Sequence, residues 1–401
     1  MLNQSTTTSH DAARPRASDP TFVLAQHGRS AVGLGVRRQW TSAADASRAL
    51  RSGEASVVVG CLPFDGRQPA ALFEPASWYP EADDAADPLL GVTDAIFDRL
   101  PVRTVHQDPA PAEHVARVAR AVAMARAGTL DKVVLARALR LELEDPTTAV
   151  ELLRRFVADD RQGNGYLVSL PADSGLPGGH MVGSSPEALI ERAGLDVYTH
   201  PLAGTAARQP EDRDLDREAA LTLQTSHKDL DEHRYVVDAI ESVLRPLCAE
   251  LDVPPLPTLT HTERIWHLGT PIRGVLADPA QTALDLAAAL HPTPAVCGSP
   301  QRAAFEHILA TESPRGFYAG AVGWCDASGN GHWRVLLRGA HLAADGRTLT
   351  ARAGGGIVAD SNPEAELAET RLKFTPVLNA LGVQERAEAL LAATAGPGTP
   401  A

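Results

Sequence analysis

Among the charged residues, lysine is what this sequence lacks. Of its 37 basic residues, three are lysines (Lys132, Lys228 and Lys373) and the others are arginines. Arginine stays charged at any usable pH, whereas lysine is a compact ammonium that burial can deprotonate. The three lysines are either chance survivors on the surface or side chains in places where arginine cannot substitute. Their segments, DKVVLAR, HKDLDEH and ETRLKF, are therefore the first candidates for chemistry.

Cysteine pairs and long apolar runs are also missing. The four cysteines (Cys61, Cys248, Cys297 and Cys325) are scattered without a CxxC spacing, which argues against a disulfide framework or a zinc site and fits a reducing cytoplasm. No run approaches the roughly 18 apolar residues of a membrane helix. The N-terminus has no apolar segment of the kind found in secretory signals. These absences predict a soluble cytoplasmic protein that binds no membrane.

Positive charge is in deficit over the whole chain. The formal net charge is −13, and no basic stripe with interleaved aromatic residues occurs, so a nucleic-acid partner is not expected. The contents of 44% hydrophobic and 22% charged residues are typical of a globular protein. A protein this acidic needs local cations or a metal ion to bind an anionic substrate, which adds interest to the few lysines.

No repeat or linker divides the chain. Residues 1–20 and 392–401 are predicted to be a disordered lead-in and a flexible tail, and residues 21–391 a single large domain. Strand-like and helix-like segments are mixed without a βαβ rhythm. We therefore expect an α+β fold with mostly antiparallel sheets flanked by helices.

Hydrophobic periodicity places the main elements. Helices are expected from Glu113 to about Gly128, from about Leu215 to Leu251, and from Ser361, where Ser361 and Glu364 have the spacing of a capping box. A strand is expected to begin at Lys132. Further strands are expected at Gly179–Gly183, Leu195–His200, Gly316–Cys325, Trp333–His341 and Thr348–Ala353.

Two acidic pairs have helical spacing. Asp229 and Glu232 are three residues apart, as are Glu366 and Glu369, so each pair shares one face of a helix. Two facing pairs would form an oxygen-rich site of the kind that Mg²⁺ prefers. Lys373 follows Glu369 by one turn and is available to an anionic ligand. Solvated acids with an ordinary Glu–Lys pair are the alternative, because spacing alone does not show that the helices meet.

Other segments offer anion-binding and acid–base groups. Glycines in PLAGT (201–205) and GGG (354–356) allow backbone N–H groups to approach a carboxylate, although an ordinary turn or a crowded strand is the alternative. Lys132 and Glu187 could act as base and acid, and His267 is a further candidate. No Walker loop, GxGxxG, GxSxG or HExxH occurs. The residues alone therefore indicate a Mg²⁺-dependent enzyme acting on a small anion.

Taken together, nine segments resemble the chorismate-utilising enzymes, which include isochorismate, salicylate, anthranilate and aminodeoxychorismate synthases. They occur in the family's order: DKVVLAR (131–137), GSSPEALIER (183–192), PLAGTAAR (201–208), HKDLDEH (227–233), WHLGTPIRG (266–274), LHPTPAVCG (290–298), RGFYAGAVG (315–323), VLLRGA (335–340) and GGGIVADSNPEAELAET (354–370). The resemblance is closest to isochorismate synthase. Asn362 departs from the family, which has an acidic residue there, and should affect only the start of the helix.

The resemblance implies one chorismate-binding domain and a role for each candidate residue. Glu232 and Glu369 are similar to the main Mg²⁺ ligands, and Asp229 and Glu366 to supporting or water-mediated ones. The catalytic candidates are Lys132, Glu187 and His267. The residues that fall where the family holds the substrate are Gly204, Thr205, Ala295, Tyr318, Arg338, Gly354, Gly356 and Lys373.

Within the family, Lys132 and Glu187 resemble the base and acid of the members that add water. Lys132 would deprotonate a water that attacks C2, and Glu187 would protonate the departing C4 hydroxyl. Lys132 must then be neutral, which burial and nearby Arg137 would favour. The expected product is isochorismate for siderophore, salicylate or menaquinone synthesis, with downstream isochorismate-processing enzymes as partners and no glutaminase subunit. Salicylate synthase and an inactive chorismate-binding protein are the alternatives.

Overall fold

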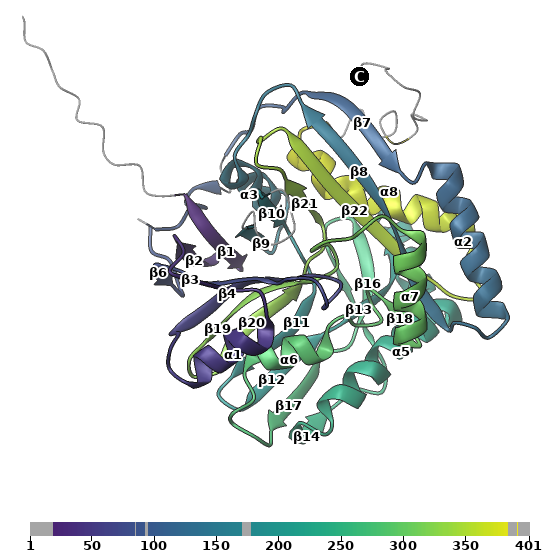
Figure 1. The fold of residues 1–401 in the computed structure, drawn as a ribbon. Coiled ribbons are helices and arrows are strands. Elements are labelled where there is room, and N and C mark those ends of the chain that lie inside the picture. Colours follow the sequence, from purple (N-terminus) through teal and green to yellow (C-terminus); the bar gives the residue numbers. More distant parts are fainter. Residues whose placement is uncertain (1–18, 85, 93–94, 171–177, 384–390, 392–401) are drawn as a thin grey trace, which may run out of the picture.

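Three antiparallel sheets and flanking helices make up the computed structural model (Figure 1), which describes residues 19–84, 86–92, 95–170, 178–383 and 391. Every strand pairing within these residues is antiparallel. The predicted α+β class with mostly antiparallel sheets is therefore confirmed. The predicted lead-in at 1–20 and tail at 392–401 fall almost wholly outside the described residues.

The first sheet, sheet A, carries most of the N- and C-terminal strands. It has ten strands and is longest where β8 pairs with β22 over ten residues. In spatial order its strands are β18 (Gly298–Ser299), β8 (Lys132–Leu143), β22 (Thr348–Ile357), β21 (Gly339–Leu342), β10 (His180–Gly183), β9 (Gly165–Ser169), β1 (Pro20–Gln26), β2 (Arg29–Leu34) and β6 (Ser77–Tyr79), with β7 (Val102–Asp108) also paired to β8.

The second large sheet, sheet B, has nine strands, and a small third sheet, sheet C, has three. The strands of sheet B are, in spatial order, β14 (Cys248–Asp252), β17 (Ile272–Leu276), β12 (Asp196–His200), β11 (Ala188–Ala193), β20 (Gly331–Val335), β19 (Ala321–Asp326), β4 (Val57–Leu62), β5 (Ala71–Glu74) and β3 (Arg38–Trp40). Those of sheet C are β13 (Leu202–Ala207), β16 (Ile265–Gly269) and β15 (Thr258–His261).

Helices cover the outer faces of the two large sheets. The described helices are α1 (Ala43–Arg51), α2 (Pro111–Arg126), α3 (Ala149–Ala158), α4 (Arg213–Thr225), α5 (His227–Leu244), α6 (Ala283–Leu290), α7 (Gln301–Thr311) and α8 (Pro363–Ala380). In Figure 1, α3 and α8 lie against sheet A, whereas α1 and α6 lie against sheet B.

Alternation along the strands explains this layering, because successive side chains point to opposite faces of a sheet. In β1, Phe22 and Leu24 face the core between the two sheets, whereas Val23 faces the core beneath α3 and α8. In β4, Val59 belongs to the core between the sheets and Val58 to the core beneath α1 and α6. Both faces of each sheet are therefore buried over much of their area.

One predicted helix is in fact two helices and a strand. The expectation of a helix from Leu215 to Leu251 is wrong because Ser226 is extended (φ −71°, ψ 113°) between α4 and α5. The Ser226 hydroxyl accepts a hydrogen bond from the backbone N–H of Asp229 and so caps α5. Helix α5 ends at Leu244, and β14 occupies Cys248–Asp252. The apolar repeat continues through this break and hides it in the sequence.

Two strand predictions also need correction, and a third strand is longer than expected. The range Trp333–His341 is divided between β20 in sheet B and β21 in sheet A, because Arg338 adopts a left-handed conformation (φ +52°) where the chain crosses between the sheets. Strand β19 begins only at Ala321, after a turn that contains Tyr318. Strand β22 continues beyond Ala353 through Gly354–Gly356, so these glycines form a strand and not a turn.

The start of α8 is capped by a different residue from the one expected. The side-chain oxygen of Asn362, and not that of Ser361, accepts hydrogen bonds from the backbone N–H groups of Glu364 and Ala365, both at 3.0 Å. The Ser361 hydroxyl instead donates to Glu366 inside the protein. The capping-box prediction for Ser361 and Glu364 is therefore wrong by one residue.

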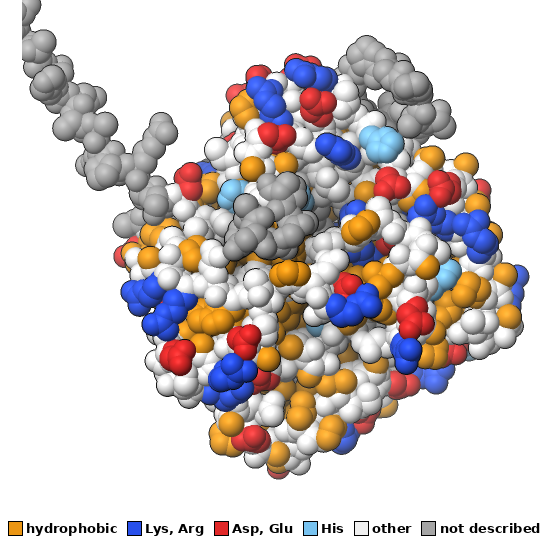
Figure 2. All heavy atoms as spheres, viewed as in Figure 1, with side chains coloured by type: hydrophobic (Ala, Val, Ile, Leu, Met, Phe, Trp, Pro, Cys, Tyr) orange, Lys and Arg blue, Asp and Glu red, His pale blue; other side chains and the backbone are white. Residues whose placement is uncertain are grey.

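Two general expectations concern the protein surface and membranes. Among the helices of the described residues, none combines the length and the apolar character that a membrane crossing requires. On the face shown in Figure 2, basic and acidic side chains are interspersed and do not gather by sign. This face therefore presents no basic stripe of the kind that nucleic-acid-binding proteins use.

Replacing the cap of α8 should weaken the protein measurably. Asn362→Ala removes the side-chain oxygen that accepts both hydrogen bonds, so we expect a loss of about 1 kcal/mol in the free energy of unfolding, seen as a lower urea midpoint. Asn362→Asp keeps the acceptor and should unfold close to the wild type. Equal midpoints for the alanine and aspartate variants would show that the cap does not stabilise α8.

Candidate active site

One cavity collects most of the predicted residues. It lies between the ends of β8 and β22, sheet C and α8, and encloses about 710 Å³ of empty space. Most of the predicted site residues line it: Glu187, Gly204, Thr205, Glu232, His267, Ala295, Tyr318, Arg338, Gly354, Gly356, Glu369 and Lys373. The remaining three, Lys132, Asp229 and Glu366, lie behind this lining in contact with it or with each other.

Lys132 is the first residue of β8 and is completely buried. Its Nζ lies 3.0 Å from Oε1 of Glu232 on α5, although the two groups are not aligned for a hydrogen bond. Gly356 lies beside this pair on β22. A Cβ at Gly356 would stand 2.1 Å from Oε1 of Glu232 and 2.8 Å from Cε of Lys132. The absence of a side chain at Gly356 therefore makes room for the Lys132–Glu232 pair.

Arg137 is not a neighbour of Lys132, contrary to the expectation from the sequence. The two residues are five apart on an uninterrupted part of β8, so their side chains leave opposite faces of sheet A. The Arg137 guanidinium lies over the ring of Phe374 at 5.8 Å. Arg137 therefore does not lie beside the Lys132 amine.

The two helices that carry the acidic pairs do meet, and one lysine joins them. Lys228 of α5 places its Nζ 3.0 Å from Oε1 of Glu366 on α8. Lys373 of α8 places its Nζ 2.5 Å from Oε1 of Glu369 and 2.8 Å from the carbonyl oxygen of Gly354. With Lys132 on Glu232, every lysine of the chain therefore pairs with one of the four predicted carboxylates.

Burial and neighbouring charge set the protonation of these acids in opposite directions. Burial, followed by the charge of Glu369, raises the pKa of Glu366 to about 7. Burial also raises the pKa of Asp229. Burial acts in the same sense on Glu369, but Lys373 outweighs it and the pKa of Glu369 is lowered. Burial opposes the charge of Lys228, yet the surrounding carboxylates outweigh it and raise the pKa of Lys228.

The carboxylates suit a hard divalent cation by their chemistry, because Mg²⁺ takes oxygen ligands. Oε2 of Glu366 is buried and has no hydrogen-bond partner in the described part of the chain, so it is an oxygen that is free to accept from a ligand. As the side chains stand, no three acidic, histidine or cysteine groups among the described residues converge closely enough to hold a metal ion. Lysines hold Glu232, Glu366 and Glu369 instead.

Glu187 stands in the segment between β10 and β11 and is 4% exposed. Its backbone oxygen accepts a hydrogen bond from the N–H of Val335, which fixes the segment to β20. Burial raises the pKa of Glu187 to about 7, although a backbone hydrogen bond from Leu202 and the charges of Lys132, Lys373 and Arg338 act against it. A carboxyl group of this kind can donate a proton near neutral pH.

His267 lies on β16, opposite Thr205 of β13 in sheet C. It is 4% exposed, and its Nε2 has no hydrogen-bond partner among the described residues. Burial and then Arg338 lower the pKa of His267 well below its usual range. The imidazole is therefore neutral, and Nε2 can donate to or accept from a group in the cavity.

Anion-binding groups line the opposite part of the cavity. The Arg338 side chain forms no hydrogen bond or ion pair within the described residues, so its guanidinium is available to a ligand. Tyr318 lies in the turn before β19, and burial raises its pKa, which keeps the phenol protonated as a donor. The backbone at Gly204 adopts φ +82° beside Asp229, a conformation that favours glycine.

Arg352 was missed by the sequence reasoning. It lines the cavity from β22, and its guanidinium donates to the Ser313 hydroxyl and to the Pro314 carbonyl oxygen. A signal was present in the sequence. Alternation places residue 352 on the same face of the strand as Gly354 and Gly356, but the segment was expected to end as a strand at Ala353.

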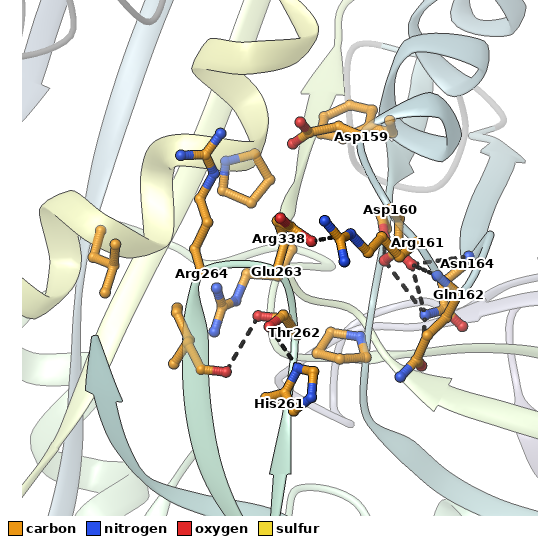
Figure 3. A pocket seen from close by; sticks show the side chains of 16 residues that line it. Asp159, Asp160, Arg161, Gln162, Asn164, His261, Thr262, Glu263, Arg264 and Arg338 are labelled. Atoms are coloured by element: carbon orange, nitrogen blue, oxygen red, sulfur yellow. Dashed lines mark hydrogen bonds and ion pairs between the residues drawn. The ribbon is translucent and has the colours of Figure 1, made fainter. Parts of the chain in front are cut away.

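A second pocket adjoins the cavity from outside and shares Arg338 and Pro186 with it. Figure 3 shows Arg338 near the centre of this outer pocket, between the loop 159–164 and the loop 261–264. An ion pair between Arg161 and Glu263 joins the two loops. The empty space of the outer pocket is about 820 Å³. Arg338 thus forms part of the wall between the outer pocket and the cavity.

Comparison with known proteins identifies the class to which this fold and cavity belong. Residues 93–382 match the family model described as "Chorismate binding enzyme". The chain belongs to this family.

Similar proteins are known from several bacteria. The MenF protein of Mycobacterium tuberculosis (strain ATCC 25618 / H37Rv) is 45% identical over 92% of this chain and 97% of its own length. The isochorismate synthase DhbC of Bacillus subtilis (strain 168) is 40% identical over 84% of this chain and 83% of its own length. The crystal structure of the DhbC protein of Bacillus anthracis has a TM-score of 0.81 at 34% identity, covering 91% of this chain and 97% of that one.

The protonation of Glu187 should be visible in the stability of the protein. Its pKa is about 7 in the folded state and near 4.5 in the unfolded chain, so the folded state binds more protons between these values. This stabilisation is complete below pH 4.5 and is lost as the pH rises through 7, by roughly 3 kcal/mol in all. Glu187→Gln cannot titrate. Between pH 5 and pH 8 the urea midpoint of the wild type should therefore fall relative to that of the glutamine variant, and parallel midpoints would contradict the assignment.

Proposed function

We propose that this protein is a Mg²⁺-dependent isochorismate synthase that converts chorismate to isochorismate. The observation that carries the proposal is Lys132, a completely buried amine beside the cavity that Glu187 lines, in a chain of the chorismate-binding family. The product would serve siderophore, salicylate or menaquinone synthesis. We place the reaction in the cytoplasm, where the free cysteines stay reduced.

The cavity offers chorismate a partner for each anionic group. Arg338 and Tyr318 would hold the carboxylate of the enolpyruvyl side chain, since an unpaired guanidinium binds a carboxylate strongly. Lys373, Thr205 and backbone groups at Gly204, Gly354 and Gly356 would orient the ring and its carboxylate. Ala295 would contact the ring, because a small side chain there leaves room for it.

Glu232 and Glu369 would hold the metal ion, supported by Asp229 and Glu366 directly or through water. When bound, Mg²⁺ would neutralise the ring carboxylate and anchor it against these residues. For this, Glu232 must turn from Lys132 and Glu369 from Lys373, the cations that now face them.

The proton transfers would then fall to Lys132 and Glu187. Once Glu232 has turned to the metal, Lys132 would act in its neutral form and take a proton from water as the water oxygen bonds to C2. Both ring double bonds shift by one position, and the C4–O bond breaks. Glu187, protonated near neutral pH because of burial, gives its proton to the departing hydroxyl, which leaves as water. One water enters and one leaves, so chorismate and isochorismate are isomers. Neutral His267 would orient the substrate by a hydrogen bond from its unpartnered Nε2.

We do not expect a glutaminase subunit. Two alternatives remain to be tested by experiment. A salicylate synthase would carry the reaction further by eliminating pyruvate from isochorismate, and an inactive chorismate-binding protein would bind without turnover. The presence of Lys132, Glu187, Glu232, His267 and Glu369 together favours an active enzyme.

A product assay distinguishes these possibilities. Purified protein with chorismate and Mg²⁺ should form isochorismate, detected by chromatography. Salicylate and pyruvate would identify a salicylate synthase, and binding without product an inactive protein. Lys132→Arg keeps a cation beside Glu232 but cannot release a proton, so it should retain the fold and lose at least ~100-fold in kcat, the usual range for a general base. Activity close to wild type in this variant would remove Lys132 as the base.

The space beside Gly356 provides a second test. In Gly356→Ala the added methyl group would overlap Oε1 of Glu232 and press on Lys132, so both must move. Displacement of catalytic groups by about 1 Å can cost ~100-fold in rate, and we expect a loss of this order in kcat. Gly66→Ala is a matched control, because no atom lies within 4 Å of its new Cβ. Equal kinetics in the two variants would show that the Lys132–Glu232 geometry does not matter for turnover.

A further inference from the structure

Lys228 is the lysine to which neither the motifs nor the proposed reaction gives a role. It is the second residue of α5, next to the Asp229–Glu232 pair. Its Nζ lies 3.0 Å from Oε1 of Glu366 on α8 and 3.9 Å from Oδ1 of Asp229. It does not line the cavity, so it has no direct access to a substrate there. Its hydrogen bond to Glu366 is the contact through which it can act on the site.

Glu366 is held by one of its two oxygens. Its side chain is 3% exposed, and Oε1 accepts hydrogen bonds from the Lys228 ammonium at 3.0 Å and from the Ser361 hydroxyl at 2.7 Å. Oε2 is buried and has no hydrogen-bond partner among the described residues. The two hydrogen bonds to Oε1 fix the orientation of the carboxylate. Leaving Oε2 buried without a partner costs free energy, so this orientation needs an explanation.

The bare oxygen is directed toward the predicted metal ligand Glu369. A Cβ placed on Gly355 would lie 2.8 Å from Oε2 of Glu366 and 3.5 Å from Oε1 of Glu369. The two oxygens therefore face the same space beside β22. Oε1 of Glu232 lies at the neighbouring Gly356, whose Cβ position alternation directs to the other face of the strand. Rotation of Glu366 away from Lys228 would remove Oε2 from the space that it shares with Glu369.

We infer that Lys228 is a positioning residue for the divalent cation: together with Ser361 it holds Oε1 of Glu366, so that Oε2 is presented to the metal or to a water on it. The inference rests on the proposed function, because it presupposes a metal among these carboxylates. A positioning role and a purely electrostatic role predict opposite effects of removing Lys228 on the affinity for the cation. A nearby ammonium that acted by charge alone would repel the cation, and its removal would tighten binding.

Metal binding to the full chain, without substrate, tests this inference. Mn²⁺ takes the same oxygen ligands as Mg²⁺ and can be titrated by electron paramagnetic resonance. Lys228→Met removes the donor and one positive charge, and we expect the Kd for Mn²⁺ to rise about tenfold, as for other residues that orient metal ligands. Ser361→Ala removes the second donor by a smaller change and should also raise the Kd. In the double variant the fold-increase in Kd should be smaller than the product of the two single increases, because both donors hold the same oxygen.

Arg234→Met is the matched control. It removes the same charge from the same helix, but Arg234 is exposed and pairs with exposed Asp231. Its Kd for Mn²⁺ should stay within twofold of the wild type. Unchanged or tighter binding in both Lys228→Met and Ser361→Ala would overturn the positioning role while the metal site stands. The metal site itself requires that the wild type bind Mn²⁺ saturably and that Glu369→Gln abolish this binding. If either observation fails, the metal site is wrong, and the inference is wrong with it.

Discussion

The pairing of buried and half-buried acids with lysine ammonium groups is the constraint on which the rest of this site depends. Four carboxylates lie in the first two turns of α5 and α8, where the helix dipole favours negative charge. Bringing them together away from water would be prohibitive without cations, and the chain supplies one lysine to each of Glu232, Glu366 and Glu369. These pairs join β8, α5 and α8, so the charge balance of the site and the packing of its walls are the same set of contacts. Moving any of the three elements would leave a buried charge without a partner.

Strand β22 has glycines, which carry no side chain, at the positions beside these carboxylates. Strand β22 pairs with β8 without interruption from Thr348 to Ile357, yet it carries three successive glycines where the carboxylates descend on it. Glycine weakens a strand interior, and here the space beside Gly355 and Gly356 is filled by oxygens of Glu366 and Glu232. The long ladder with β8 compensates for this loss. The same backbone that closes the sheet therefore also forms the floor of the cavity.

Sequence reasoning succeeded where function imposes a spacing and failed where the chain changes direction. The three-residue intervals within Asp229–Glu232 and Glu366–Glu369 placed each pair correctly on one helical face, and the nine family segments indicated the family to which the chain belongs. The break at Ser226 and the crossing at Arg338 were missed, because apolar periodicity runs through both and the deciding features are single backbone conformations. The pairing of each lysine with a carboxylate was also out of reach. Lys132–Glu232 and Lys228–Glu366 join residues that are far apart in the chain. Lys373 pairs with a residue one helical turn away, but its sequence neighbourhood offers several possible partners.

The scarcity of lysine acquires a physical reason from these contacts. Buried ion pairs add little net stability, since the cost of removing two charges from water roughly cancels their attraction, so three such pairs at one place are hard to explain as stabilising elements. A compact ammonium on a flexible stem can release a carboxylate when a stronger cation arrives, whereas a guanidinium holds it through two parallel hydrogen bonds. Arginine serves this chain well where the pairing is permanent, as in the buried Arg315–Glu312 pair. In the metal site that we propose, lysine remains where the partner would be given up, at Glu232 and Glu369, or where one oxygen would be held and the other left free, at Glu366.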